Sequence, residues 1–330
     1  MKQLSLFGSE EYQAEKKLDW KNPLEYIKNR EAPDSNSPIV VSFGGGTNST
    51  AMLIAMVYKN IKPDLILFAD TGAELPETYE WVETFSRWLV SQGFPEITTV
   101  RRGTTEALKP RKKLIYKWEV NKVNLEWFVF SLWLGLLSNG NQFLSYSTLY
   151  EDCIALKGMP SRVFNRGECS IKYKIDPCNW YVEEKYKSIL GVVKIRKLVG
   201  YHSGELRRLI NKKENPFEDK YYRKEHPLIE WGINQQDCIN LIQTIGLGVP
   251  PKSSCFFCPN RKQNEVRELK EKHPELYEAA CFIEENYDVQ PGGFIGLGRN
   301  WRWSDLDKLT PLEQVLIENR QQNRNCACID

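Results

Sequence analysis

Short apolar runs alternate with amphipathic stretches through the first two thirds of the chain. The stretch from Ala51 to about Asn60 and the stretch Glu77–Gly93 have the pattern of helices. Strands that alternate with helices at this spacing indicate βαβ units and hence a parallel sheet. Four apolar runs are each short enough to be a buried strand, namely Ile39–Phe43, Asp64–Ala69, Ile97–Val100 and Val192–Val199.

The first predicted strand runs into a glycine turn and then into a helix. Such a turn leaves the first backbone N–H groups of the helix without partners and points the positive end of its dipole at one place, which favours an anion. Neither a Walker A spacing nor G-x-G-x-x-G is present. We therefore predict a nucleotide-phosphate site of another type, with a tight polar-capped turn as the alternative. The turn comprises Gly44, Gly45, Gly46, Thr47, Asn48, Ser49 and Thr50.

Polar residues also follow the other predicted strands. Asp70–Gly72 comes after the second strand, Arg101-Arg102 after the third, and residues 200–208 (GYHSGELRR) after the fourth. Ligands of parallel sheets bind at the carboxyl ends of the strands, so we expect these exits to lie beside the glycine turn. His202 is a candidate phosphate contact, with a structural role as the alternative.

Composition narrows the class of protein. The chain has 330 residues, 41% hydrophobic and 27% charged, which is typical of a globular protein of one or two domains. A net charge of +2 argues against a strongly basic nucleic-acid-binding protein. The basic run Lys109–Lys113 is either a solvated face or a contact for substrate phosphates. The longest apolar run, Leu125–Leu137, is too short to span a bilayer, and the N-terminus has no secretory signal, so we expect a cytoplasmic protein without a membrane partner.

The chain has nine cysteines, which in a reducing compartment are more often ligands than disulfides. Cys255 and Cys258 form a C-x-x-C turn that suits a metal or a cluster, with a redox dithiol as the alternative. Cys169 is a third candidate, and the fourth ligand is open. Cys281 is the candidate we favour, and the terminal Cys326 and Cys328 are either ligands, a redox pair or incidental thiols. Three others are interpreted first as small buried residues, namely Cys153, Cys178 and Cys238.

Five segments in fixed order carry a family resemblance. They are VSFGGGTNSTAML, FADTGAELPETYEWV, ECSIKYKIDP, HPLIEWGINQQDC and SSCFFCP, spread over about residues 38–285. Together they resemble the phosphoadenosine phosphosulfate (PAPS) reductase family of the PP-loop ATP pyrophosphatases, which belong to the adenine nucleotide alpha hydrolase superfamily. The resemblance implies an α/β fold, with a mostly parallel five-stranded sheet, helices on both faces, and a C-terminal helical region that bears the cysteines.

With this resemblance, the chain is expected to divide into three parts around one site. Residues 1–37 would be a flexible tail with a short helix, 38–210 the PP-loop nucleotide-binding domain, and 211–330 the helical region, entered through the charged connection Lys212–Lys224. The resemblance implies that ATP or another adenine nucleotide, with Mg²⁺ as a candidate companion, binds Ser42 and Gly44–Thr50. Four further positions would line the adenosine or shape the pocket, together with Gly72: Asp70, Thr71, Glu77 and Thr78. In the iron–sulfur branch of the family, Cys169, Cys255 and Cys258 would hold a [4Fe–4S] cluster.

Some residues depart from the family pattern. The usual loop is S-G-G-x-D-S, but here Gly44 replaces the first Ser and Asn48 replaces the Asp, which weakens a metal-handling role at that position. Cys169-Ser170 stands where adenylylsulfate reductases have two adjacent cysteines, and the E-C-G-[IL]-H motif of the reductases is missing. These departures favour a specialised branch over assimilatory sulfate reduction.

The leading hypothesis is ATP-dependent adenylation of a substrate oxygen followed by sulfur transfer, onto a nucleic acid (DNA or tRNA) or a small molecule. The catalytic candidates are Asn48 and Ser49 in the loop, with Arg101, Arg207 and Arg208 as cations for the leaving group. One alternative is a sulfonucleotide reductase that uses the terminal thiols. Another is a non-catalytic nucleotide-binding module with structural zinc.

A short peptide near the N-terminus is a separate candidate. Gln3–Phe7 (QLSLF) is similar to the pentapeptide by which bacterial proteins dock on the replicative sliding clamp. An N-terminal strand or apolar anchor is the alternative interpretation.

Overall fold

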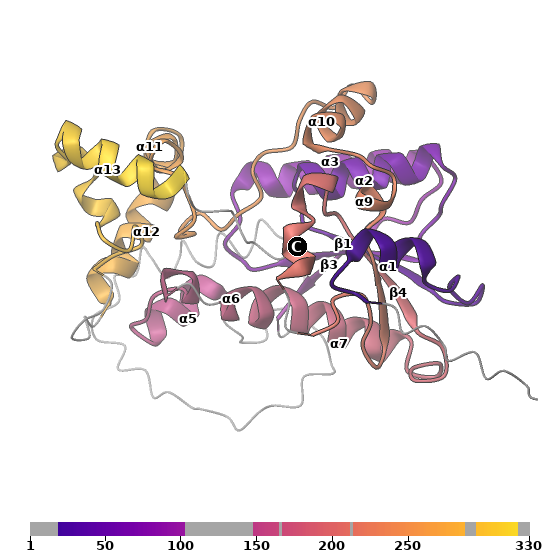
Figure 1. The fold of residues 1–330 in the computed structure, drawn as a ribbon. Coiled ribbons are helices and arrows are strands. Elements are labelled where there is room, and N and C mark those ends of the chain that lie inside the picture. The colour runs from indigo at the N-terminus through magenta and orange to yellow at the C-terminus, as the bar shows by residue number, and fades with distance from the viewer. Residues whose placement is uncertain (1–18, 103–147, 165–166, 212–213, 288–294, 323–330) are drawn as a thin grey trace, which may run out of the picture.

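The computed structural model describes residues 19–102, 148–164, 167–211, 214–287 and 295–322 (Figure 1). Several predicted features lie outside these residues and stay predictions. They are the clamp-like peptide Gln3–Phe7, the basic run Lys109–Lys113, the apolar run Leu125–Leu137 and the thiols of Cys326 and Cys328.

Five parallel strands form the centre of the molecule, in the order β3-β2-β1-β4-β5. The α/β fold and the five-stranded sheet are confirmed, and the four strands predicted from apolar runs are all present. From β1 the chain builds outward to β3 and then returns to the other side of β1 at β4. The direction of winding therefore reverses between β1 and β4, which is where open parallel sheets bind ligands. The strands are β1 (Ile39–Phe43), β2 (Leu65–Asp70), β3 (Ile97–Arg101), β4 (Ile195–Val199) and β5 (Tyr222–Glu225).

Helices cover both faces of this sheet, as expected. One face is covered by α2 (Thr47–Tyr58), α3 (Pro76–Ser91) and α10 (Gln235–Thr244), and the other by α7 (Asp176–Lys185). Successive residues of a strand point to opposite faces, and β1 and β2 are apolar on both sides over most of their length. Val41 thus belongs to the core beneath α2 and Val40 to the core beneath α7.

The fifth strand corrects one expectation. The sequence predicts a charged connection over Lys212–Lys224, but the end of this segment forms β5. The strand reads YRKE and has no apolar alternation. Its charged residues can be accommodated at the edge of the sheet because Glu225 is paired with two arginines. Arg196 Nε and Nη2 donate to Glu225 at 2.9 and 2.8 Å, and Arg223 Nε donates to it at 3.2 Å. The sheet layer, with α9 (Pro227–Glu230) and α10, therefore continues past residue 210.

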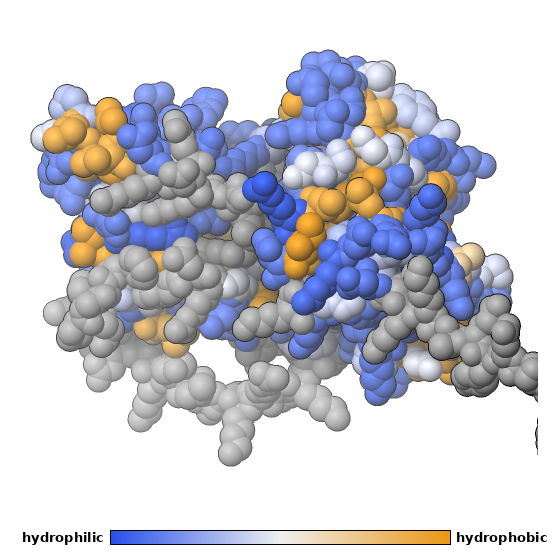
Figure 2. All heavy atoms as spheres, viewed as in Figure 1, coloured by the Kyte–Doolittle hydropathy of each residue, from blue (hydrophilic) through white to orange (hydrophobic). Residues whose placement is uncertain are grey.

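A second core lies beside the sheet and contains the predicted cysteine-bearing helices. Phe256, Phe257 and Trp303 are at its centre, and Glu284, 1% exposed, accepts the backbone N–H groups of Leu297 (2.7 Å) and Trp303 (2.9 Å). Its elements are α5 (Leu149–Ala155), α11 (Gln263–Lys272), α12 (Pro274–Asn286), η4 (Trp303–Lys308) and α13 (Pro311–Gln322). Three apolar side chains on α13 are exposed, where Figure 2 shows an apolar patch, namely Leu312, Val315 and Leu316.

Short elements complete the described chain. The short helix predicted in the N-terminal segment is present as α1 and is packed on the body, because Tyr26 stacks on Phe217 with ring centroids 4.7 Å apart. None of the described helices combines the length and hydrophobicity that crossing a bilayer demands. The remaining elements are α1 (Pro23–Asn29), η1 (Ser161–Phe164), α6 (Glu168–Ser170), η2 (Ile171–Ile175), η3 (Ser203–Glu205) and α8 (Arg207–Ile210).

The close approach of β4 to α2 generates a stability prediction. A Cβ added at Gly200 would lie 2.9 Å from Ser49 Cα and 3.0 Å from Ser49 N, and backbone atoms cannot rotate away. We expect Gly200→Ala to lower the free energy of unfolding by about 1–3 kcal/mol, measured by urea denaturation. The control is Gly158→Ala, whose added Cβ would meet only atoms at 3.8 Å or beyond, so that its effect should stay within about 0.5 kcal/mol. Equal effects of the two substitutions would contradict the close packing.

Candidate functional site

The glycine turn after β1 has the geometry of an anion site. Gly45 has φ of +73°, and no side chain among the described residues caps the start of α2 at Gly46. The Ser49 hydroxyl accepts the N–H of Gly44 at 3.2 Å and donates to the carbonyl of Gly46 at 3.3 Å, so the serine fixes the shape of the turn from within. The first N–H groups of this 12-residue helix are thus left for a ligand.

The exit of β4 brings three further polar residues to this turn. Glu205 Oε2 accepts the amide of Asn48 Nδ2 at 2.9 Å and the backbone N–H of His202 at 3.3 Å. Glu205 Oε1 pairs with Arg208 Nη2 at 2.8 Å. Asn48, His202 and Arg208 therefore lie together around Glu205, a residue that sequence reasoning did not select. Arg207, in contrast, is exposed and lies outside this network.

A stack of rings supports Arg208 from behind. Its guanidinium carbon lies 5.1 Å from the centroid of the Tyr201 ring, which gives a cation–π contact. Tyr201 in turn stacks on His226, with centroids 5.1 Å apart and an angle of 3° between the ring planes. His226 is only 3% exposed, so the stack is anchored in the core.

The loop after β2 is organised by Asp70. Its carboxylate accepts the N–H of Gly72 at 2.7 Å, the hydroxyl of Tyr79 at 2.8 Å and Nε of Arg101 at 2.9 Å. Burial lowers the pKa of Arg101, but the Asp70 carboxylate more than offsets this, so the pKa of Arg101 is raised. Arg101 thus lies at the carboxyl edge of the sheet, where its contact with Asp70 fixes the orientation of both side chains. Gly72 has φ of +67°, and an added Cβ there would lie 2.3 Å from Thr148 Cγ2.

The predicted pocket residues at the start of α3 separate in the structure. Thr78 is fully buried under the glycine turn, since a Cβ on Gly45 would lie 3.4 Å from Thr78 Cγ2. Glu77 instead pairs with His273 Nε2 at 2.6 Å and so faces the C-terminal helices. Thr78 therefore supports the turn directly, whereas Glu77 connects the sheet layer to the second core.

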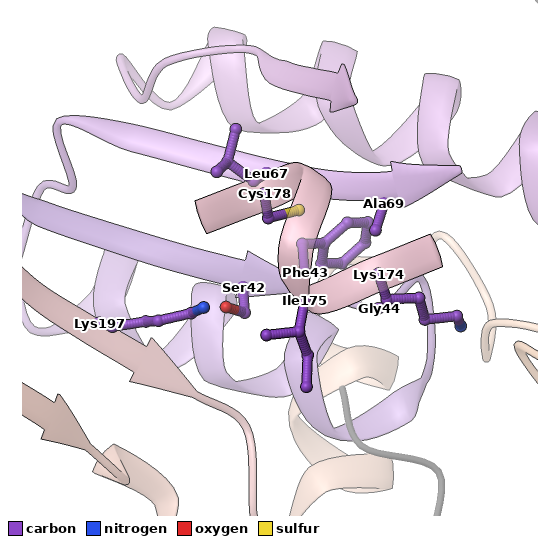
Figure 3. Close-up of a pocket in the computed structure, with 9 residues that line it drawn as sticks. All are labelled: Ser42, Phe43, Gly44, Leu67, Ala69, Lys174, Ile175, Cys178 and Lys197. Carbon is purple, nitrogen blue, oxygen red and sulfur yellow. The ribbon is translucent and has the colours of Figure 1, made fainter. Parts of the chain in front are cut away.

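A small pocket of about 30 Å³ lies at the carboxyl ends of the strands on the α7 side (Figure 3). Two of its lining residues, Ser42 and Gly44, were predicted from the sequence to contact a nucleotide. Two lysines that also line it, Lys174 and Lys197, were not predicted. Lys197 Nζ donates to Asn179 Oδ1 at 2.7 Å, and burial lowers the pKa of Lys197. The lining residues are Ser42, Phe43, Gly44, Leu67, Ala69, Lys174, Ile175, Cys178 and Lys197.

The cysteine turn is attached directly to two of these loops. Thr71 Oγ1 lies 3.3 Å from Cys255 Sγ and donates to Glu74 Oε1 at 3.3 Å. The N–H of Phe256 donates to the carbonyl of Ala73 at 2.8 Å, and Ser253 donates its hydroxyl to the carbonyl of Gly44. The segment before the C-x-x-C turn therefore lies against both the glycine turn and the loop after β2.

Buried charges surround the thiol of Cys255. Glu74 is 1% exposed, and Lys174 Nζ pairs with its Oε1 at 3.4 Å. Burial raises the pKa of Cys255, the Glu74 carboxylate raises it further, and the Lys174 ammonium lowers it. Arg261 donates to the carbonyl oxygens of Cys255 and Ser254, both at 3.2 Å, and so holds the backbone of the turn.

The other cysteines differ in how close they lie to this turn. Cys169 is an electrostatic neighbour of both Cys255 and Cys153, since its charge raises the pKa of each. Cys281 has Glu284, Glu285, Tyr277 and Lys270 as its neighbours instead, and burial is the main reason why its pKa rises to about 12. Cys153 and Cys281 both belong to the core against which Cys169 and Cys255 pack, and the role of Cys281 as a ligand stays a prediction.

Within the described part of the chain, no three His, Cys, Asp or Glu side chains gather closely enough to hold one metal ion. The ligands of an iron–sulfur cluster bind different iron atoms and are usually thiolates. The type of donor fits, because Cys169, Cys255 and Cys258 offer three thiols, and Cys169 and Cys255 pack against the same core. The cluster itself remains a proposal.

Comparisons with known proteins point to the family that the sequence resembles. Residues 38–125 match the phosphoadenosine phosphosulfate reductase domain family. Two uncharacterized proteins of Methanocaldococcus jannaschii, MJ0066 and MJ0973, are 23% and 22% identical over 86% and 88% of this chain. The chain covers 49% and 57% of their lengths, so it spans about half of the curated relatives that it matches.

Among solved structures, the chain is similar to the U34-tRNA thiolase NcsA from Methanococcus maripaludis, determined with its [4Fe-4S] cluster. The identity is 14% and the TM-score 0.33, with 80% of this chain and 77% of the thiolase covered. The match over residues 38–125 confirms the predicted likeness to the PAPS reductase family.

The buried stack behind Arg208 predicts a pH dependence of stability. Burial lowers the pKa of His226 to about 3, whereas the unfolded chain takes up this proton near pH 6.5. Stability contributed by the neutral ring is therefore complete above pH 6.5 and is lost as the pH falls from 6.5 toward 3, by about 1.4 kcal/mol per pH unit. We expect this histidine to account for a loss of about 2 kcal/mol between about pH 7.5 and pH 5.

The measurement is urea unfolding at about pH 7.5, 6 and 5. His226→Phe keeps an aromatic ring on Tyr201 but cannot take up a proton, so its stability should fall less steeply over this range. Parallel pH profiles of the two proteins would contradict the prediction.

Proposed function

We propose that this PAPS reductase-like protein uses ATP to adenylate an oxygen of its substrate and then replaces that oxygen with sulfur. The observation that carries the proposal is the contact between Thr71 Oγ1 and Cys255 Sγ at 3.3 Å. It joins a loop at the carboxyl edge of the sheet, beside the glycine turn, to the cysteine turn. Chemistry that needs both a nucleotide and a thiol-bound group can thus take place in one site.

The proposed reaction has two steps that balance without an oxidant. First, the substrate oxygen attacks the α-phosphorus of ATP, the bond to the β-phosphate oxygen breaks, and pyrophosphate leaves. Second, sulfur at the oxidation level of sulfide attacks the activated carbon, the carbon–oxygen bond breaks, and AMP leaves with the oxygen. The sulfur donor is sulfide, so no electrons are exchanged with a further reactant. The substrate is a nucleic acid, DNA or tRNA, or a small molecule.

The residues of the site suit the first step. The N–H groups at the start of α2 and the turn Gly44–Gly46 would bind phosphate oxygens, and Ser49 keeps the turn in shape. Ser42 and Lys197 line the small pocket that adjoins Gly44 on the α7 side of the sheet. Mg²⁺ would accompany the phosphates of the nucleotide. Preorganised donors of this kind stabilise charge that develops on a leaving group.

The cysteines suit the second step. Cys169, Cys255 and Cys258 would hold the [4Fe–4S] cluster, which would supply an open iron site for sulfide. Thr71 connects Cys255 to the buried carboxylate of Glu74. The protein itself therefore fixes where the sulfur would be presented relative to the loop after β2.

The test is an anaerobic purification followed by assays of composition and turnover. Iron, acid-labile sulfide and zinc are quantified, and pyrophosphate and AMP are measured with ATP, sulfide and either tRNA or DNA. Iron with sulfide, and AMP formation that depends on both sulfide and nucleic acid, supports the proposal. Sulfite release from a sulfonucleotide without ATP turnover would instead identify a sulfonucleotide reductase. Zinc without sulfide, and no turnover of ATP, would identify a nucleotide-binding module.

The contact with Thr71 gives a sharper prediction. Thr71→Val removes the hydroxyl and leaves Glu74 Oε1 without this donor, at a cost of about 1–3 kcal/mol for a buried polar group. We expect iron and sulfide content and sulfur-dependent AMP formation to fall about tenfold, while the dissociation constant for ATP changes less than about threefold. Thr71→Ser keeps the hydroxyl and is the matched control. Loss of all three quantities together in the valine variant would contradict a specific role at the cysteine turn.

A further inference from the structure

Glu205 lies at the glycine turn although it is 157 positions from Asn48 in the sequence. The contact exists because the exit of β4 packs against the first turn of α2, where Gly200 leaves room for Ser49. Both oxygens of Glu205 are engaged: Oε1 with Arg208 at 2.8 Å and Oε2 with Asn48 at 2.9 Å. The Glu205 side chain is only 15% exposed, so water screens these contacts weakly.

The chemistry of the contact fixes the orientation of Asn48. An ionised carboxylate accepts hydrogen bonds and cannot donate them, so the amide nitrogen of Asn48 must face Glu205 and the amide oxygen must be turned away from it. An aspartate at this position would instead place two carboxylates within hydrogen-bonding distance. Asn48, which departs from the usual loop, is therefore compatible with the neighbouring Glu205, whereas an aspartate would be repelled by it.

The charges of the network also balance. Glu205 carries one negative charge, Arg208 one positive charge, and Asn48 none, so the group as a whole does not repel an anion at the start of α2. A second carboxylate would leave a net negative charge beside the N–H groups that bind phosphate. In this arrangement the positive end of the helix is left unopposed.

We infer that Glu205 is the positioning residue of the glycine turn: it holds the Asn48 amide and the Arg208 guanidinium in the orientation that binds the phosphates of a nucleotide. The inference rests on the proposed function in so far as it takes the ligand of this turn to be a nucleotide.

The same contacts define what Glu205 does not do. A carboxylate that binds a divalent cation needs an oxygen open to the metal, and here one oxygen pairs with a guanidinium while the other accepts from Asn48 and from the N–H of His202. Glu205 therefore acts through Asn48 and Arg208, and any Mg²⁺ at this turn would arrive bound to the nucleotide.

The test exchanges the amide and the carboxylate. Glu205→Gln and Asn48→Asp are made singly and together, and ATP binding is measured by isothermal titration calorimetry. Glu205→Gln loses the charge-assisted hydrogen bond to Asn48, and Asn48→Asp places a second carboxylate beside Glu205. We expect the dissociation constant for ATP to rise about 10- to 100-fold in each single variant. In the double variant the carboxylate introduced at position 48 can accept a hydrogen bond from the amide introduced at position 205. The dissociation constant should therefore return to within about tenfold of the wild-type value.

A second readout does not depend on nucleotide. Hydrogen exchange of the backbone amides at 44–50 is compared in the ligand-free proteins, and Glu205→Gln should exchange about tenfold faster there than the wild type. Glu218→Gln is the control, because it removes the same charge from an ion pair with Lys194 at the edge of the sheet and should alter neither readout.

The outcomes separate this inference from the proposed function. Wild-type protein that binds no ATP would overturn the proposed function, and the exchange rates at 44–50 would then decide the role of Glu205. Unchanged exchange and unchanged ATP binding in Glu205→Gln would overturn the inference. So would a double variant whose loss is the sum of the two single losses, since additivity means that the two side chains do not act as a pair.

Discussion

The absence of a side chain at Gly200 allows β4 to end directly against the first turn of α2. With backbone atoms of Ser49 about 3 Å from the position where a Cβ would stand, no other residue fits there without displacing the helix. This packing places η3 and α8 beside the glycine turn and makes the contact between Asn48 and Glu205 possible. The segments that follow β1 and β4 therefore lie in contact at the point where the winding reverses, and this contact depends on Gly200.

A second connection brings the cysteines to the same edge of the sheet. The chain that leaves α10 passes Ser253, which donates to Gly44, and then reaches Cys255, which contacts Thr71. Arg261 holds the carbonyl oxygens of the segment from the other side. Because Ser253 bonds the backbone of the glycine turn and lies two residues before Cys255, a shift of the glycine turn is passed on to the cysteine turn. The two cores of the molecule meet at the place where the proposed chemistry needs them.

Much of this architecture could be predicted from local pattern, and the rest could not, for identifiable reasons. The strands β1 and β2 are apolar over most of their length, and β3 and β4 carry apolar residues at both ends, so all four stand out as short apolar runs. The strand β5 reads YRKE, and its charges are satisfied by Arg196 and other partners that only the sheet provides. The glycine turn was predictable because its residues are contiguous. The exit that carries Glu205 was also predicted, but its pairing with Asn48 was not, because no local pattern shows a contact across 157 positions. Lys197 was missed because it lies within β4, where a lysine gives no sign of a pocket.

The pairing of charges explains how the site can remain receptive to an anion although carboxylates surround it. Each of three neighbouring acidic side chains has a cationic partner: Asp70 has Arg101, Glu74 has Lys174, and Glu205 has Arg208. These pairs cancel locally, and a buried pair with good hydrogen bonds also fixes the geometry of its loop. Groups outside these pairs include the N–H groups at the start of α2 and Lys197, which donates to a neutral amide; in the proposed function these groups would set the field at a bound phosphate. The ion pairs fix the shape of the loops, and the backbone dipoles at the start of α2 attract an anion. A substitution that breaks one ion pair should disturb both the shape of its loop and the attraction of an anion, because it leaves an uncompensated charge where the dipoles act.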